Sequence, residues 1–201
     1  FACDIDADTR TAYQHNFSLV PMGDIVSIKV EDIPDHDILL AGFPCQPFSI
    51  IGRQQGVADP RGTLFLEIIR IVRAKRPRGI VLENVKQLST VRHGGVLRDI
   101  MGQLRELGYS VDYRVLNALD FGLPQKRERT IIVATLPAFK TFPWPNGTVP
   151  MAPLADLLEP SPDRKYFVSE TIRAKRRAAH TADVTPAIWH ENKADSVLEL
   201  L

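Results

Sequence analysis

Cysteine is scarce in this chain: its 201 residues include only two, Cys3 and Cys45, far apart in the sequence. Their spacing supports neither a disulfide framework nor a zinc site, so we expect no bound metal and a reducing, cytoplasmic environment. No apolar run approaches the roughly 20 residues that a membrane-spanning helix needs, and a signal-peptide pattern is missing. The chain also has no internal repeat and no low-complexity tract. These absences predict a soluble intracellular protein without a membrane partner.

An excess of charge is also missing, because the formal net charge is only +1. That value neither demands nor excludes a nucleic acid partner. A local basic cluster occurs at 173–177, and such a cluster is more often a solvated helix face than a binding site. The composition, 44% hydrophobic and 24% charged, suits one globular α/β domain that buries a real core.

Apolar runs and helical periodicities alternate along the first part of the chain. We expect strands at 1–5, 37–41, 79–83, 109–116 and 130–134, and helices at 8–17, 63–72 and 96–107. Asp8 and Thr63 are the expected helix caps, and Gly108 is the expected end of the last helix. The alternation predicts an α/β fold with a doubly wound, mostly parallel sheet. From Pro137 onward, frequent prolines break the pattern, so we expect a core over 1–136 and a proline-rich connection over 137–201.

The peptide Gly-Phe-Pro-Cys-Gln-Pro-Phe-Ser at 42–49 directly follows the strand expected at 37–41. Cys45 therefore lies at the carboxyl end of a strand, the edge at which open α/β sheets bind ligands. Prolines on either side of the thiol fix φ and remove two backbone donors, which is typical of a presented nucleophile. The alternative is a small buried hydrophobic residue, the commonest fate of a free cysteine. Only partner groups can decide between the two.

Such partners are present further along the chain. Glu83 ends the strand expected at 79–83, so its carboxyl group should emerge at the same edge as Cys45. A carboxyl group in a partly dry site can donate a proton at neutral pH, as general acid catalysis requires, although Glu83 could equally cap a helix or pair with Lys86. Arg127 and Arg129 share one face of an extended segment and suit phosphate or carbonyl oxygens. An exposed, charged start to a strand would explain the same pattern.

Together, the peptide at 42–49, Glu-Asn-Val at 83–85 and Gln-Lys-Arg-Glu-Arg at 125–129 resemble the motifs of the cytosine-C5 DNA methyltransferase family, in its bacterial modification-enzyme form. The resemblance extends to 59–64 and 116–124 and covers about residues 1–136. It implies the Rossmann-like fold of S-adenosylmethionine-dependent methyltransferases. It also implies double-stranded DNA as the partner, and a restriction-modification system with a companion restriction endonuclease or another host methylation system.

The resemblance assigns a role to each predicted catalytic residue. Cys45 would attack C6 of a cytosine that has been flipped out of the duplex. Glu83 would hold or protonate N3 of the same base. Arg129 would approach O2, and Arg127 would fix the flipped nucleotide's backbone or the environment of the thiolate. In the loop that follows Cys45, the expected DNA contacts are Gln46, Ser49 and Arg53. Alternatively, these three are ordinary polar loop residues.

The resemblance also assigns residues to S-adenosylmethionine. Asp4 would bind the ribose hydroxyls, Asp24 would accept from the adenine amino group, and Ile5 and Ile25 would lie against the ring. The alternatives are a helix-capping Asp4 and a turn-forming Asp24. Family members often carry Glu and a bulkier aromatic residue in place of Asp4 and Ile5, so both contacts can differ in strength. The remaining expected members of the cofactor wall are Phe43, Pro44 and Leu64.

Two family elements are expected outside this chain: a glycine-rich Phe-x-Gly-x-Gly segment before Phe1, and the target-recognition region after Leu201. The sheet would then lack its first strand, and residues 137–201 would lead into a truncated recognition region. A fragment of this kind is expected to be poorly stable, to bind S-adenosylmethionine weakly and to lack site-specific activity. An RNA cytosine-C5 methyltransferase and a non-catalytic fragment of the same fold are the alternatives. Phe43 and the Gln-Lys-Arg at 125–127 favour the DNA enzyme.

Overall fold

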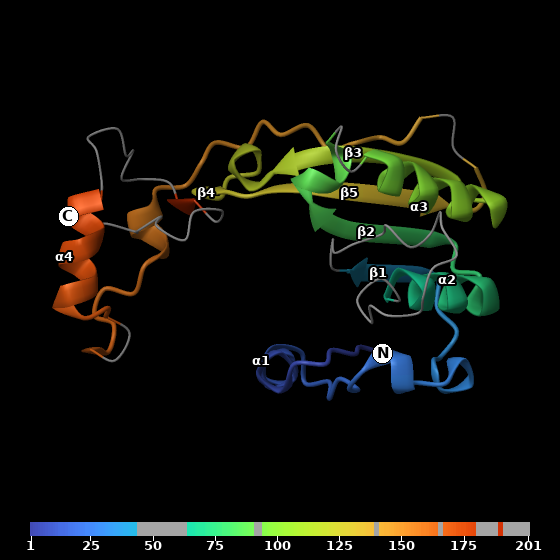
Figure 1. Ribbon diagram of the computed structural model, residues 1–201, viewed down its shortest axis with the longest axis horizontal. Helices are drawn as coiled ribbons and strands as arrows, with labels where there is room; N and C mark the ends of the chain where they lie inside the picture. The colour runs from blue at the N-terminus through green and yellow to red at the C-terminus, as the bar shows by residue number, and fades with distance from the viewer. Residues whose placement is uncertain (44–63, 91–93, 139–140, 165–166, 180–188, 191–201) are drawn as a thin grey trace. The chain divides into compact units, whose positions relative to one another are not determined.

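The computed structural model describes residues 1–43, 64–90, 94–138, 141–164, 167–179 and 189–190 (Figure 1). Contacts between residues divide the chain into two compact units. Unit 1 comprises Phe1–Arg114 and Thr130–Pro143, and unit 2 comprises Val115–Arg129 and Trp144–Leu201. The expected change from core to connection near residue 136 is a functional boundary and stays a prediction.

A four-stranded sheet has the strand order β1-β2-β5-β3. Its strands are β1 (Ile38–Gly42), β2 (Gly79–Val85), β3 (Ser110–Asn117) and β5 (Glu128–Thr135). Strands β1 and β2 pair in parallel. Strand β5 runs the opposite way to β2: Leu136 N, just after β5 ends, donates to Arg78 O at 2.8 Å, and Thr130 Oγ1, near its start, donates to Val85 O at 3.3 Å. The predicted α/β fold is confirmed, as a mixed sheet with one antiparallel strand.

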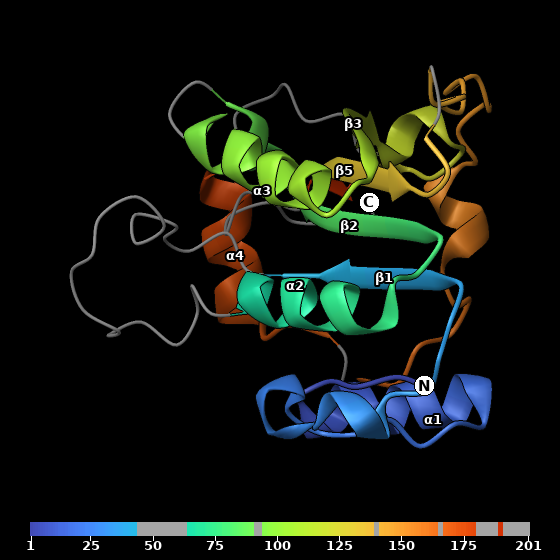
Figure 2. The same cartoon turned by 90° about the vertical axis from the view of Figure 1, so that its right-hand side faces the viewer.

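Helices α2 (Leu64–Lys75) and α3 (Gly94–Glu106) lie side by side over one face of this sheet (Figures 1 and 2). Helix α2 buries its residues at 65, 68, 69 and 72, the i, i+3, i+4, i+7 spacing of one helical face. These side chains pack against the apolar residues of β2 and β5 in one core cluster. Burial of each large apolar side chain stabilises the fold by roughly 1.5–3 kcal/mol. Helix packing therefore fixes β2, the strand that carries Glu83.

Both helices end at a residue with positive φ that follows their last turn. Helix α3 is closed by Gly108, as predicted, with φ of 89° in the left-handed region. Arg76 follows α2 with φ of 52°, and its guanidinium donates to Leu107 O at 2.6 Å. The same guanidinium lies 5.3 Å from the centre of the Tyr109 ring. Burial raises the pKa of Tyr109, while the charge of Arg76 opposes that change.

The prediction of a strand at 1–5 was wrong. The structure has a single isolated parallel bridge there, between Cys3 and Met22. Two hydrogen bonds make the bridge: Asp4 N donates to Met22 O at 3.0 Å, and Met22 N donates to Ala2 O at 2.8 Å. The chain turns into a short 3-10 helix, η1 (Ile25–Ser27), soon after Met22, so the pairing cannot continue into a ladder.

The expected cap of the first helix was also wrong by two residues. Helix α1 (Ala7–Phe17) begins after Asp6, whose Oδ1 accepts from Thr9 N at 2.7 Å. That hydrogen bond lowers the pKa of Asp6. Asp8 lies within the first turn, where an acidic residue interacts favourably with the positive end of the helix dipole.

Unit 2 contains the shorter elements. Strand β4 (Gln125–Lys126) pairs in parallel with β6 (Trp189–His190), and an isolated bridge joins Phe121 to Val149. The basic cluster at 173–177 lies on helix α4 (Glu170–Ala179). Among the helices that the structure describes, none combines the length and the apolar character that a membrane crossing requires.

Candidate active site

The pairing of β1 with β2 places Glu83 beside the end of β1. Gly42, the last residue of β1, is the partner of Glu83 in the parallel register, three residues before Cys45. A Cβ at Gly42 would lie 3.7 Å from Glu83 Oε2, so the carboxyl group reaches over the last residue of β1. Strand β2 continues to Val85, so Glu83 lies inside the strand rather than at its last position as predicted. Glu83 as a whole is partly buried there.

Asn84 holds the segment that leads to Cys45. Its side chain is only 2% exposed. Its Nδ2 donates to Phe43 O at 2.7 Å, and its Oδ1 accepts from Val85 N at 2.8 Å. The Phe43 ring, also buried, packs 5.8 Å from the ring of Phe65 at the start of α2. The backbone two residues before Cys45 is therefore held by a buried hydrogen bond and an aromatic contact.

Sequence reasoning named Asn84 only as part of a motif and gave it no structural role. Its position in the alternation of β2 could have revealed that role. Ile80, Leu82 and Asn84 occupy alternate positions of β2, and all three are buried. A polar amide in line with two core residues must satisfy its hydrogen bonds inside the protein.

Several predicted site residues lie outside the described residues, and their roles stay predictions. These are Pro44, Cys45, Gln46, Ser49 and Arg53. Leu64, the next predicted residue that the structure describes, begins α2 and is partly buried.

Asp4 and Asp24 come together on either side of Cys3. The bridge between Cys3 and Met22 brings the segment that contains Asp4 beside the segment that leads to Asp24. Burial, and then the charges of Asp4 and Asp24, raise the pKa of the Cys3 thiol, so both carboxylates lie near one side chain. Asp24 Oδ1 accepts from Val26 N at 3.0 Å and caps η1, and Asp4 Oδ1 accepts from Asp6 N at 2.8 Å. The turn-forming role weighed for Asp24 is therefore present. An ionised carboxylate has about four acceptor sites, so neither local bond uses up its capacity.

The two isoleucines beside these acids differ. Ile5 is 74% exposed, whereas Ile25 is partly buried against a small cluster formed by Ile28, Ile33 and Ile71. Two carboxylates next to an exposed apolar side chain suit a nucleoside, because ribose hydroxyls and an exocyclic amine need acceptors and a purine ring needs an apolar wall. The donor and acceptor set at this edge therefore fits the adenosine part of S-adenosylmethionine.

Arg127 and Arg129 have well-fixed backbones in unit 2. Arg127 N donates to Asn117 Oδ1 at 3.1 Å, and Arg127 O accepts from Ala118 N at 3.0 Å. Arg129 lies in β5, and its Nη1 donates to Glu128 O at 3.0 Å. Sequence reasoning missed Asn117, which caps the short helix after β3 and also orients the arginine segment. The arginines belong to unit 2 and Glu83 to unit 1, so their meeting at one site stays a prediction.

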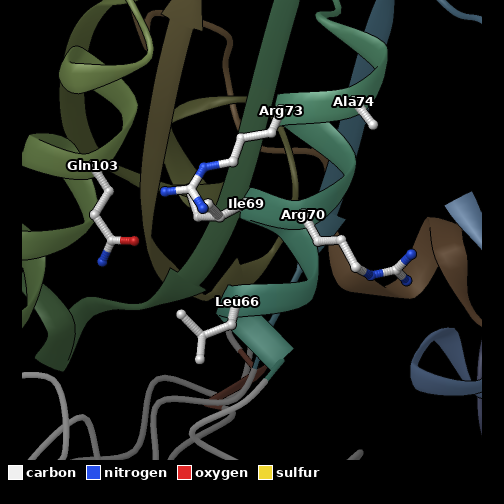
Figure 3. Close-up of a pocket in the computed structure, with 6 residues that line it drawn as sticks. All are labelled: Leu66, Ile69, Arg70, Arg73, Ala74 and Gln103. Atoms are coloured by element: carbon white, nitrogen blue, oxygen red, sulfur yellow. The ribbon is translucent and has the colours of Figure 1, made fainter.

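A cavity of about 470 Å³ lies beside α2 and α3 (Figure 3). Its lining consists of Leu66, Ile69, Arg70, Arg73, Ala74 and Gln103. None of the predicted site residues lines it, so this cavity is not the candidate active site. Within the part of the chain that the structure describes, no group of three or more His, Cys, Asp or Glu residues is placed to hold a metal ion.

Comparison with known proteins gives one consistent result. The family model described as C-5 cytosine-specific DNA methylase matches residues 1–196. Type II methyltransferase M.NgoBI of Neisseria gonorrhoeae is 48% identical over 206 residues, which cover 100% of this chain and 64% of that protein. Type II methyltransferase M.HaeII of Haemophilus aegyptius is 48% identical over 205 residues, with the same two coverages. The chain thus spans somewhat less than two thirds of the length of these relatives.

A solved structure supports the fold. The Entamoeba histolytica methyltransferase EhMeth matches with a TM-score of 0.68 at 20% identity, over 88% of this chain and 57% of that protein. At this identity the likeness bears on the fold alone.

Proposed function

The chain belongs to the C-5 cytosine-specific DNA methylase family, and from that premise we propose that the complete protein methylates C5 of cytosine in double-stranded DNA. The methyl donor in this proposal is S-adenosylmethionine, which the family and the fold imply. One observation supports the proposal most directly. The register of β1 and β2 pairs Glu83 with Gly42, next to the Phe43 carbonyl that Asn84 holds. An acid and the segment leading to a thiol are thereby close neighbours.

In the proposed reaction, Cys45 and Glu83 act on opposite sides of one cytosine. C5 of cytosine is a poor nucleophile, so the Cys45 thiolate first forms a bond to C6. The electron pair of the C5–C6 double bond then moves toward C4, and negative charge develops at N3. Glu83 donates a proton to N3, which neutralises the developing charge. S-adenosylmethionine, when bound, supplies the electrophilic methyl group that C5 accepts. After methyl transfer N3 returns its proton to Glu83, and water accepts the C5 proton, which restores the C5–C6 double bond and expels the Cys45 thiolate.

The cytosine cannot react inside a stacked duplex, so it must swing out into the site. In our proposal Arg129 binds O2 of the flipped base, and Arg127 fixes its backbone or the environment of the thiolate. We assign Gln46, Ser49 and Arg53 to contacts with the DNA. Phosphate contacts of this kind orient the protein on the duplex without selecting a sequence.

The cofactor assignment starts from the two carboxylates of unit 1. Asp4 would accept from the ribose hydroxyls and Asp24 from the adenine amino group. Ile5 and Ile25 would form the apolar wall for the ring. The remaining residues assigned to this wall are Phe43, Pro44 and Leu64. The raised pKa of Cys3 supports the pairing of the two carboxylates, because the charges of Asp4 and Asp24 both contribute to it.

We further propose that the protein serves a restriction-modification system and works beside a companion endonuclease in the cytoplasm. The names of both relatives, type II methyltransferases, support this assignment. Expression of the complete protein should make host DNA resistant to an endonuclease with the same recognition sequence.

The test of the chemistry uses a mechanism-based trap. DNA is synthesised with 5-fluorocytosine in place of every cytosine, so that the unknown recognition sequence is included. Fluorine cannot leave as the proton does, so the complete protein should become covalently attached to this DNA in the presence of S-adenosylmethionine. Cys45→Ala should abolish both attachment and methyl transfer while S-adenosylmethionine binding persists. Cys3→Ala, which removes the other cysteine of these 201 residues, is the matched control and should still be trapped.

Two results would contradict this mechanism. The first is normal methyl transfer by Cys45→Ala. The second is a trapped complex that contains Cys3 rather than Cys45 on peptide mapping.

A further inference from the structure

Arg70 of α2 holds the turn that contains Asp24 and Ile25. Its Nη2 donates to Ile25 O at 3.2 Å and to Ile28 O at 3.0 Å, across more than 40 residues of sequence. Arg70 is among the residues that line the cavity beside α2 and α3, but Figure 3 shows its guanidinium group directed away from Gln103, whereas that of Arg73 points toward Gln103. The two carbonyls that it binds lie at the beginning and just beyond the end of η1. Arg70 therefore bridges the two ends of this turn from α2.

The guanidinium group is itself held in place. Arg70 Nε donates to Glu67 Oε2 at 2.6 Å, one helical turn earlier on α2. The two side chains are 33% and 18% exposed, so the pair is partly shielded from water. A planar guanidinium can donate to Glu67 through one nitrogen and to both carbonyls through another, whereas an ammonium group is a compact point charge without this fixed geometry. The arrangement is specific for arginine.

Other contacts attach the same segment to α2, but they do not orient η1. Ile71 packs against Ile28 and Ile33, which docks the segment on the helix through apolar burial. Lys75 Nζ lies 3.1 Å from Asp35 Oδ1, but the Asp35 side chain is 94% exposed, so this ion pair contributes little. Only Arg70 is seen to contact the carbonyls of η1 from α2, among the described residues. Loss of its side chain would leave the segment docked and the turn free to change conformation.

We propose that Arg70 is a positioning residue of the S-adenosylmethionine site, which fixes η1 so that Asp24 and Ile25 meet the adenine ring. The inference rests on the proposed function, specifically on Asp24 as a cofactor contact. Asp24 caps η1 through Val26 N, so the direction of its carboxylate depends on the conformation of that turn. Ile25 O accepts from both Ile28 N and Arg70, which links the turn's own hydrogen bond to α2.

The test compares Arg70→Met and Arg70→Lys with Arg73→Met in the complete protein. Arg73 lies on the same helix, is exposed and lines the cavity, so it is a matched control for loss of one arginine. Calorimetry measures the Kd of S-adenosylmethionine, and steady-state assays measure kcat and the KM of cofactor and of DNA. Asp24→Asn is measured in parallel as a direct cofactor variant. Thermal unfolding reports how much of each variant is folded.

We expect Arg70→Met to raise the Kd and KM of S-adenosylmethionine roughly tenfold, the size of one lost charge-assisted hydrogen bond. At saturating cofactor, kcat and the KM of DNA should stay within about twofold of the parent values, since the reacting groups are elsewhere. Arg70→Lys keeps the charge and should fall between parent and Arg70→Met. If Arg70→Met fails to fold, the Kd and KM of Arg70→Lys are compared with those of the parent instead. Arg73→Met should match the parent.

The outcomes separate this inference from the proposed function. If Asp24→Asn weakens cofactor binding while the folded Arg70 variants bind normally, Arg70 has only a structural role and the inference is wrong. If Asp24→Asn also binds S-adenosylmethionine normally, the cofactor assignment itself fails. If kcat falls in the Arg70 variants with Kd unchanged, positioning of the adenine site is likewise refuted.

Discussion

Replacement of Asn84 by alanine should damage both stability and the presentation of Cys45. The amide side chain makes two hydrogen bonds in the interior, to Phe43 O at 2.7 Å and from Val85 N at 2.8 Å. Asn84→Ala removes both partners at once. Because Asn84 is only 2% exposed, water replaces the two lost hydrogen bonds poorly. The Phe43 carbonyl also loses the hydrogen bond that holds it to β2, two residues before the nucleophile.

The size of the effect follows from these two bonds. A buried polar group left without a partner costs about 1–3 kcal/mol. Two such groups predict a loss of roughly 2–6 kcal/mol in the free energy of unfolding. Domains are commonly stable by only about 5–15 kcal/mol, so the variant should fold but with a clearly lower denaturant midpoint. A displacement of about 1 Å near a reacting group can cost on the order of 10²-fold in rate, and we expect a loss of that order in trapping by 5-fluorocytosine DNA.

Thr130→Val is the matched control for this experiment. Thr130 is 0% exposed, and its hydroxyl donates to Val85 O at 3.3 Å, so the substitution removes a partly buried hydrogen bond at the same end of β2. It leaves the Phe43 carbonyl untouched. Thr130→Val should lower stability by about 1 kcal/mol and leave the trapping rate per folded molecule unchanged. Parent-like trapping by folded Asn84→Ala would refute the reasoning, as would an equal loss of trapping in both variants.

Two further predictions concern Glu83 and Cys3. Glu83→Gln keeps the shape of the side chain but removes its acid, so methyl transfer should slow by on the order of 10²–10⁴ at saturating cofactor, with cofactor affinity unchanged; weak cofactor binding with a normal maximal rate would instead make Glu83 structural. Burial, and then the charges of Asp4 and Asp24, raise the pKa of Cys3. In a Cys45→Ala background, alkylation of Cys3 should therefore require a higher pH than alkylation of a free thiol. Asp4→Asn should move that pH profile downward, measured by mass spectrometry of the modified peptide, and an unmoved profile would contradict the proximity of Asp4.

Local patterns in the sequence determined the helices and most strands. The buried positions of α2 repeat at helical spacing, and Gly108 is the residue best suited to the left-handed end of α3, so both helices were predicted close to their observed bounds. The neighbourhood of Glu83 and the Cys45 segment was also predictable. Parallel strands bring their carboxyl ends to one edge, and the register of β1 with β2 places Glu83 beside Gly42, three residues before Cys45, whose own place at the site stays a prediction. These features depend on residues close in sequence or on a general rule of parallel sheets.

Other features depended on the tertiary structure because each depends on a partner distant in sequence. The run at 1–5 satisfies the local criteria for a strand, but the partner that pairs with it among the described residues turns away after Met22. The role of Asn84 depends on a carbonyl 41 residues away, and that of Arg70 on carbonyls 42 and 45 residues away. A buried polar group takes whatever donor or acceptor the folded chain brings to it. Residue type and local spacing decide which segments become helices and strands, but the choice of that partner is made only when the layers pack.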